Sequence, residues 1–164
     1  MYIQPHMRQL LPLVLIPLVT AATLAPKPVK WAVGASVVGV KPGSVAQIVI
    51  YADIERGWHV YSLTQKAGGP VPLRIQVTRA PDLSLAAAID GPSPKKEFDK
   101  NFGLATEKYS GRARFVIPIL ASTTAQPGPR QLTVLARFQA CSETLCHPAR
   151  TERMKVVMNV ERPR

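Results

Sequence analysis

Residues 131–138 read Gln131-Leu132-Thr133-Val134-Leu135-Ala136-Arg137-Phe138, with an apolar side chain at every second position from Leu132 onwards. Successive side chains of a β-strand point to opposite faces, so this pattern predicts a strand with one buried face. Residues 153–160 alternate in the same way, with the apolar phase beginning at Met154. We therefore expect strands at 131–140 and 151–160 that pair as a hairpin around residues 141–150.

The same period of two recurs along the chain, and helical periodicity is hard to find after residue 25. It predicts strands at 73–78 and 112–119, and further strands are expected at 31–40, 45–53, 58–62, 83–89 and 105–109. Turn sequences such as Lys41-Pro42-Gly43-Ser44 and Pro127-Gly128-Pro129 separate them. Many short strands at this spacing predict an all-β fold, an immunoglobulin-like antiparallel β-sandwich formed by residues 26–164.

The first 25 residues have the organisation of a secretory signal peptide. Arg8 precedes an apolar run from Leu10 to Val19, and small residues follow at Thr20-Ala21-Ala22. The run is shorter than the roughly 20 residues that a membrane-spanning helix needs. We expect residues 1–25 to be removed on export, with no stable membrane insertion afterwards; the alternative is a buried or anchoring N-terminal helix.

The net charge of the 164-residue chain is +11, but the basic residues are scattered along it. There is no arginine run and no basic helix, so binding to nucleic acid is not indicated. Solvated outer faces of strands explain the charge most simply. A second interpretation is electrostatic attraction to an acidic partner protein.

Cys141 and Cys146 are the only cysteines, and both lie in the connection between the two predicted hairpin strands. Export implies an oxidising compartment, and a hairpin end brings such residues within the Cα–Cα range of about 4.4–6.8 Å that a disulfide requires. A bridge closing so small a ring stabilises little, which favours redox use over a structural staple. Both uses remain open. A metal site with His147 and His59 is less favoured, because the paired spacing of zinc ligands is missing.

One segment, residues 91–103, interrupts the strand pattern. It is long and polar, and it carries Phe98 and Phe102. We interpret it as a loop, and long loops in compact domains are often functional. The simpler alternative is that both rings fold back onto the edge of the core.

Three segments, in order over about residues 30–160, carry a resemblance to a known family. They are Glu55–Ser62, then Glu97–Gly103 with Glu107–Tyr109, and finally Phe138–Cys141 with Cys146–Pro148 and Thr151. Together they resemble the N-terminal periplasmic domain of the thiol–disulfide interchange protein DsbD. The chain differs from the family signature in its cysteine spacing, which is one residue shorter than in the best-known member, and in Ala149, which replaces a proline.

The resemblance implies an immunoglobulin-like domain in the periplasm whose cysteine pair is redox-active and needs no metal or other cofactor. Its electrons would come from a thioredoxin-like domain or a membrane electron-transfer protein and pass to a periplasmic oxidoreductase. By the same resemblance Cys146 forms mixed disulfides, Cys141 resolves them, and Phe98 caps the pair, with Phe102 in the same loop. His147 would favour a Cys146 thiolate if it were protonated.

Two functions therefore remain. The first is a thiol–disulfide exchange module that relays reducing equivalents and receives them from a separate protein. The second is a non-catalytic immunoglobulin-like adaptor or binding domain in which the disulfide is only structural.

Overall fold

The computed structural model describes residues 27–78 and 80–162, so the predicted signal peptide lies outside the described residues. No helix in these residues is long and apolar enough to cross a membrane. The described chain forms twelve strands: β1 (Val29–Val33), β2 (Val37–Val40), β3 (Val45–Ile54), β4 (His59–Tyr61), β5 (Arg74–Val77), β6 (Leu83–Leu85), β7 (Lys95–Asp99), β8 (Leu104–Tyr109), β9 (Arg112–Ala121), β10 (Gly128–Phe138), β11 (Ala140–Cys141) and β12 (Arg150–Val160).

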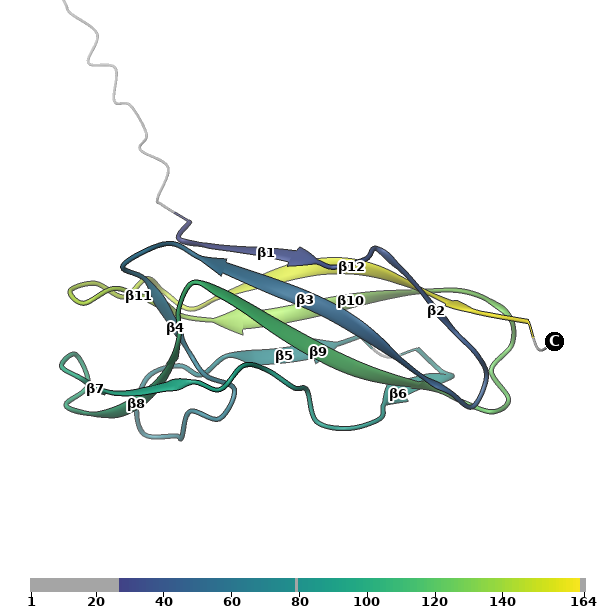
Figure 1. Cartoon of the computed structure of the whole chain (residues 1–164), viewed down its shortest axis with the longest axis horizontal. Coiled ribbons are helices and arrows are strands. Elements are labelled where there is room, and N and C mark those ends of the chain that lie inside the picture. The colour runs from purple at the N-terminus through teal and green to yellow at the C-terminus, as the bar shows by residue number, and fades with distance from the viewer. Residues whose placement is uncertain (1–26, 79, 163–164) are drawn as a thin grey trace, which may run out of the picture.

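These strands form three four-stranded sheets, with the orders β1-β3-β9-β6, β2-β12-β10-β5 and β11-β4-β8-β7. The first two sheets face each other along the length of the molecule, and the third lies at one end (Figure 1). The strand pairs are antiparallel except β2 with β12, which run parallel. The prediction of an all-β, immunoglobulin-like sandwich is confirmed.

The core lies between the first two sheets and is filled by the apolar phases of the long strands. Ile48 on β3, Ile117 on β9 and Val134 on β10 are fully buried. The Trp31 ring stacks on Phe115 at a centroid distance of 5.9 Å and contacts Phe138 at 5.5 Å. Each fully buried side chain of this size contributes about 1.5–3 kcal/mol by leaving water, so the alternating pattern is the main source of stability.

Two strand predictions were wrong in extent. The predicted strand 31–40 is divided into β1, which pairs with β3, and β2, which pairs with β12 in the facing sheet. The chain bends between Gly34 and Ser36, because one straight strand cannot bond to both sheets. The predicted strand 83–89 ends at Leu85, whose partner is Ile119. The next residue of β9 is Pro118, which has no N–H group to continue the ladder.

The interpretation of residues 91–103 as a loop was also wrong in part. Residues 95–99 form β7, which pairs with β8 at the edge of the end sheet. The charged sequence Lys95-Lys96-Glu97 hides the strand pattern. Charged side chains are common on edge strands, where they discourage pairing with other chains.

The core assignment predicts a large difference between two truncations on β3. Ile48→Ala should lower the free energy of unfolding by about 2–5 kcal/mol, because it leaves a cavity at a fully buried position. Val45→Ala on the same strand, at a position that is 53% exposed, should change it by only about 0.5 kcal/mol. Urea unfolding of both variants is the measurement, and equal losses would contradict the assignment.

Candidate functional site

The cysteine hairpin, residues 139–149, continues directly from the end of the β10–β12 ladder, whose last pair is Phe138 with Arg150. A tight turn closes it: the Ser142 N–H donates to the Leu145 carbonyl at 2.7 Å, and the His147 N–H donates to the Ala140 carbonyl at 2.9 Å. These bonds bring the two cysteines face to face as a β-bridge.

Cys141 and Cys146 form a disulfide with a Cα–Cα distance of 4.0 Å, slightly below the range expected from the sequence. The two residues differ in exposure. Cys141 is completely buried, whereas Cys146 is partly exposed. An incoming thiolate therefore reaches Cys146 more easily than Cys141.

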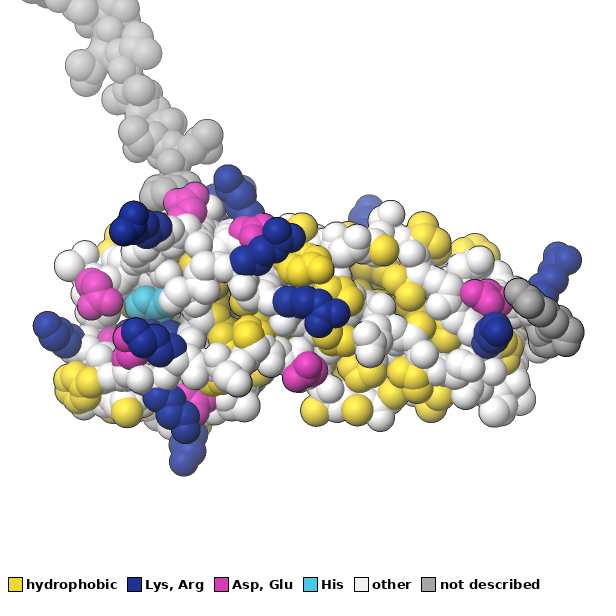
Figure 2. All heavy atoms as spheres, viewed as in Figure 1, with side chains coloured by type: hydrophobic (Ala, Val, Ile, Leu, Met, Phe, Trp, Pro, Cys, Tyr) yellow, Lys and Arg dark blue, Asp and Glu magenta, His cyan; other side chains and the backbone are white. Residues whose placement is uncertain are grey.

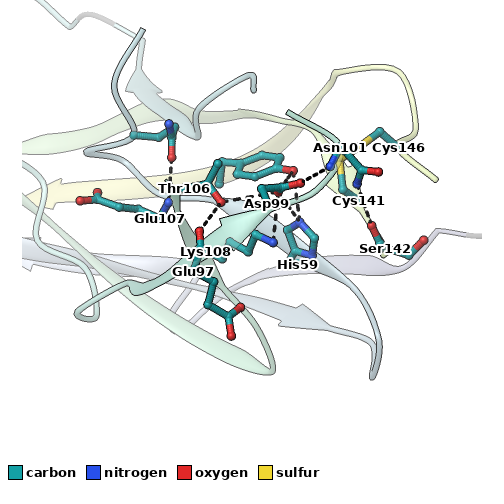
Figure 3. Close-up of polar contacts among 12 residues, drawn as sticks. His59, Glu97, Asp99, Asn101, Thr106, Glu107, Lys108, Cys141, Ser142 and Cys146 are labelled. Atoms are coloured by element: carbon teal, nitrogen blue, oxygen red, sulfur yellow. Dashed lines mark hydrogen bonds and ion pairs between the residues drawn. A yellow bond between two sulfur atoms is a disulfide. The ribbon is translucent and has the colours of Figure 1, made fainter. Parts of the chain in front are cut away.

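Cys141 lies beside a buried polar cluster of His59, Tyr61, Asp99 and Lys108 (Figure 3). Cys141 on β11 is the direct partner of His59 on β4, so their side chains lie on the same face of the end sheet with Cβ atoms about 4.5–5.5 Å apart. The same face carries Tyr61, which pairs with Lys108 on β8. Asp99 enters from the end of β7.

Asp99 is the centre of this cluster. Its Oδ2 atom accepts a hydrogen bond from the Tyr61 hydroxyl at 2.9 Å and lies 3.1 Å from the Lys108 ammonium group. Burial alone would raise the pKa of Asp99. The hydrogen bonds from Tyr61, Lys108 and the Asn101 N–H outweigh burial and hold that pKa below its usual value. Asp99 and Lys108 therefore form a buried ion pair.

The cluster also fixes the proton position on His59. Burial, followed by repulsion from Lys108, lowers the pKa of His59 despite the nearby Asp99 carboxylate, so the ring is neutral at neutral pH. The Tyr61 hydroxyl has one proton and donates it to Asp99, so it must accept from His59 Nε2, which lies 3.2 Å away. His59 then carries its proton on Nε2 and leaves Nδ1 free to accept another.

The segment after β7 lies against the cysteine hairpin. The Asn101 amide donates to the Ser142 carbonyl at 3.5 Å, and the Phe102 ring meets Tyr61 edge-on at 5.8 Å. Gly103, at φ = 67°, returns the chain by donating its N–H to the Asp99 carbonyl at 2.8 Å. Phe98 is 67% exposed and, by strand alternation, lies on the face of β7 opposite Asp99. Its capping role stays a prediction.

A comparison with known protein families identifies the family to which a chain with this cysteine hairpin belongs. Residues 27–158 match the family described as thiol:disulfide interchange protein DsbD, N-terminal. The chain belongs to this family. A search of curated proteins found no match.

Solved structures similar to this chain share little sequence with it. AggA, the major subunit of aggregative adherence fimbriae type I from Escherichia coli, has a TM-score of 0.45 and 9% identity, covering 82% of this chain and 95% of AggA. The periplasmic chaperone SfaE has a TM-score of 0.33 and 14% identity, covering 80% of this chain and 58% of the chaperone chain.

His147 lies at the side of the DsbD-type cysteine hairpin. Its ring packs against Trp58 at a centroid distance of 4.7 Å, and its carbonyl accepts from the Gln139 amide at 3.1 Å. These contacts fix the residue next to Cys146. Its influence on the Cys146 thiolate stays a prediction.

The sequence patterns of this DsbD-family domain do not mark Asp99, Tyr61 and Lys108 as members of the site. Tyr61 was seen only as part of a strand motif, and Asp99 only as part of a loop. Lys108 carried one usable signal: it occupies the same phase of β8 as the buried Thr106. A lysine in a buried phase needs a nearby acid, but the sequence does not show which one.

The Asp99–Lys108 pair predicts unequal effects of removing one charge or both. Asp99→Asn leaves the Lys108 ammonium group buried without a counter-ion and should cost about 3–5 kcal/mol of unfolding free energy. Asp99→Asn combined with Lys108→Met removes both charges and should recover much of that loss. Urea unfolding of the oxidised protein at neutral pH measures both, and a double variant no more stable than the single one would contradict the pairing.

Proposed function

We propose that this protein is a periplasmic thiol–disulfide exchange module that relays reducing equivalents through Cys141 and Cys146. The observation that carries the proposal is the unequal burial of the two cysteines in a disulfide of a DsbD-type domain. Exchange needs one sulfur that a partner thiolate can attack and a second, adjacent sulfur that resolves the mixed disulfide. The proposed donor is a thioredoxin-like domain or a membrane electron-transfer protein, and the proposed acceptor is a periplasmic oxidoreductase.

Reduction of the domain would proceed in two exchanges. A donor thiolate attacks Cys146, a donor–Cys146 bond forms, and Cys141 leaves as a thiolate. The second donor thiolate then attacks the donor sulfur, which releases Cys146 and leaves the donor oxidised. Two electrons have moved to the domain. Delivery to the acceptor reverses these roles: the Cys146 thiolate attacks the acceptor disulfide, and Cys141 resolves the mixed disulfide.

Cys141 must lose its proton before it attacks, because the thiolate is the nucleophile. Since Cys141 is buried away from water, a neighbouring side chain has to accept that proton. The neutral His59 ring, with Nδ1 free, lies beside Cys141 on the neighbouring strand. We assign it the role of taking the Cys141 proton before resolution and returning it when Cys141 leaves as a thiolate. The Asp99 carboxylate, through Tyr61, would stabilise the protonated ring.

The alternative function is an immunoglobulin-like adaptor with a structural disulfide. The complete burial of Cys141 fits this alternative as well. The reduction potential separates the two functions. A structural bridge has a potential below about −300 mV, whereas exchange proteins lie above that value.

Single-cysteine variants test the proposed roles directly. Cys141→Ala removes the resolving thiol and should accumulate a mixed disulfide through Cys146 with a thioredoxin-like partner that lacks its own resolving cysteine. Cys146→Ala should accumulate none. A non-reducing gel shows the adducts.

Two results would count against the proposal. Trapping through Cys141 alone would reverse the roles of the cysteines. Trapping by neither variant, together with a wild-type disulfide that resists dithiothreitol, would favour the structural staple.

The capping hypothesis is tested by comparing two phenylalanines. If Phe98 shields the reduced cysteines, Phe98→Ala should speed their reaction with a thiol reagent and change the unfolding free energy by only about 0.5 kcal/mol, because the ring is exposed. Phe102→Ala is the matched variant, since it removes the ring that contacts Tyr61. Faster labelling of Phe102→Ala alone would assign the shield to Phe102.

A further inference from the structure

In the sheet formed by β2, β12, β10 and β5, the outward positions of β12, β10 and β5 carry positive charge only, and the Glu161 carboxylate lies over Gly39 on β2, at the end away from the cysteines. The outward positions include Arg74 on β5, Arg137 on β10, and Arg153 and Lys155 on β12, all exposed. We call these four residues the basic face. The outward phases of β5, β10 and β12 contain no Asp or Glu, and none of the four forms an ion pair with another described residue.

Strand register brings the four cations together. Arg137 is the direct partner of Arg74, so their Cβ atoms lie about 4.5–5.5 Å apart. Arg153 pairs with Leu135 and is therefore the diagonal neighbour of Arg137, about 7–8 Å away. Lys155 is the next outward residue on β12. Like charges directly opposite each other destabilise a sheet, so folding of the domain alone does not explain this arrangement.

The opposite sheet provides the contrast. There Arg112 pairs with Asp53 at 3.5 Å and lies over the Tyr51 ring. On the side of the molecule seen in Figure 2, blue and magenta side chains are interspersed. Charge of one sign is therefore a property of the basic face and not of the whole surface.

The basic face begins at the redox end of the sandwich with Arg74 and Arg137, and it extends to Lys155 near the middle of the β10–β12 ladder. Arg137 precedes Cys141 by four residues, which limits their separation to about 14 Å. Arg74 reaches toward β4 by donating to the Leu63 carbonyl at 3.2 Å. A partner domain of about 100 residues has a radius of gyration of about 13 Å, so one seated on the cysteine hairpin would extend over Arg74 and Arg137.

We propose that the basic face docks an acidic surface of the redox partner and steers that partner onto Cys146. This inference rests on the proposed exchange function and adds the chemistry that selects the partner. Attraction between opposite charges raises the rate of encounter, and salt weakens it. The face is too small for nucleic acid, since it offers four cations and no basic helix, and its position beside the disulfide favours a protein over a lipid surface.

The test measures how fast a reduced thioredoxin-fold domain of net negative charge reduces the Cys141–Cys146 disulfide. The rate constant of the wild type should fall as NaCl rises from about 20 mM to about 500 mM. Arg137→Glu combined with Arg153→Glu should lower the low-salt rate about tenfold or more and flatten the salt dependence. Glu at position 137 would face Arg74, an attractive pair, so the variant should fold.

Three controls keep the outcomes distinct. Arg114→Glu combined with Lys41→Glu makes the same charge change away from the basic face and should leave the rate near that of the wild type. A positively charged version of the thioredoxin-fold domain should lose the salt dependence or reverse it. Dithiothreitol attacks as a singly charged thiolate and has no protein surface to dock, so its rate should fall far less in the Arg137/Arg153 variant than the rate of the acidic domain.

A wild-type rate that is independent of salt, or an equal loss in both double variants, would overturn the docking proposal while leaving exchange intact. No reduction of the wild type by either reductant would instead overturn the exchange function. Vesicles containing phosphatidylglycerol give the remaining outcome: binding abolished by the Arg137/Arg153 changes, with unchanged exchange rates, would assign the basic face to a membrane and refute partner docking.

Discussion

Eleven residue pairs join β10 to β12 in one antiparallel ladder, from Gly128 with Val160 to Phe138 with Arg150. One face of this ladder supplies much of the core, and the other carries the basic face. The chain turns where this ladder ends, at Phe138 and Arg150, and the cysteine hairpin forms the turn. The longest paired segment among the described residues therefore sets the position of Cys141 and Cys146, and it holds these two residues in register although the connection between the strands is short.

The end sheet, β11-β4-β8-β7, surrounds Cys141 with polar side chains. β11 pairs with β4, so Cys141 lies beside His59, and the β4–β8–β7 pairing adds Lys108 and Asp99. A buried ion pair contributes little net stability, because removing both charges from water costs about as much as their attraction returns. Its effect here is on the protons: Asp99 stays ionised, and the Nε2 proton of His59 is fixed through Tyr61.

The proposed exchange chemistry and the proposed partner recognition occupy adjoining parts of the sandwich. The first depends on short-range contacts around a buried sulfur, and the second on long-range attraction from an exposed sheet face. Burial strengthens interactions within the cluster, whereas salt screens those on the surface. The two proposed properties can therefore be changed separately.

The strand alternation of residues 131–138 and 153–160, the sandwich and the cysteine hairpin could be predicted from the sequence, because a period of two and turn residues are local signals. Predictions from these local signals were wrong where the structure of a segment depends on which other strand pairs with it. Residues 95–99 form a strand only because β8 pairs with them, and residues 31–40 divide because two sheets compete for them. Tertiary structure alone decided that Asp99 meets Lys108, that His59 faces Cys141, and that Arg74 stands opposite Arg137. Each of these pairs joins residues on different strands, and only the register between those strands, set by packing the whole core, determines which side chains meet.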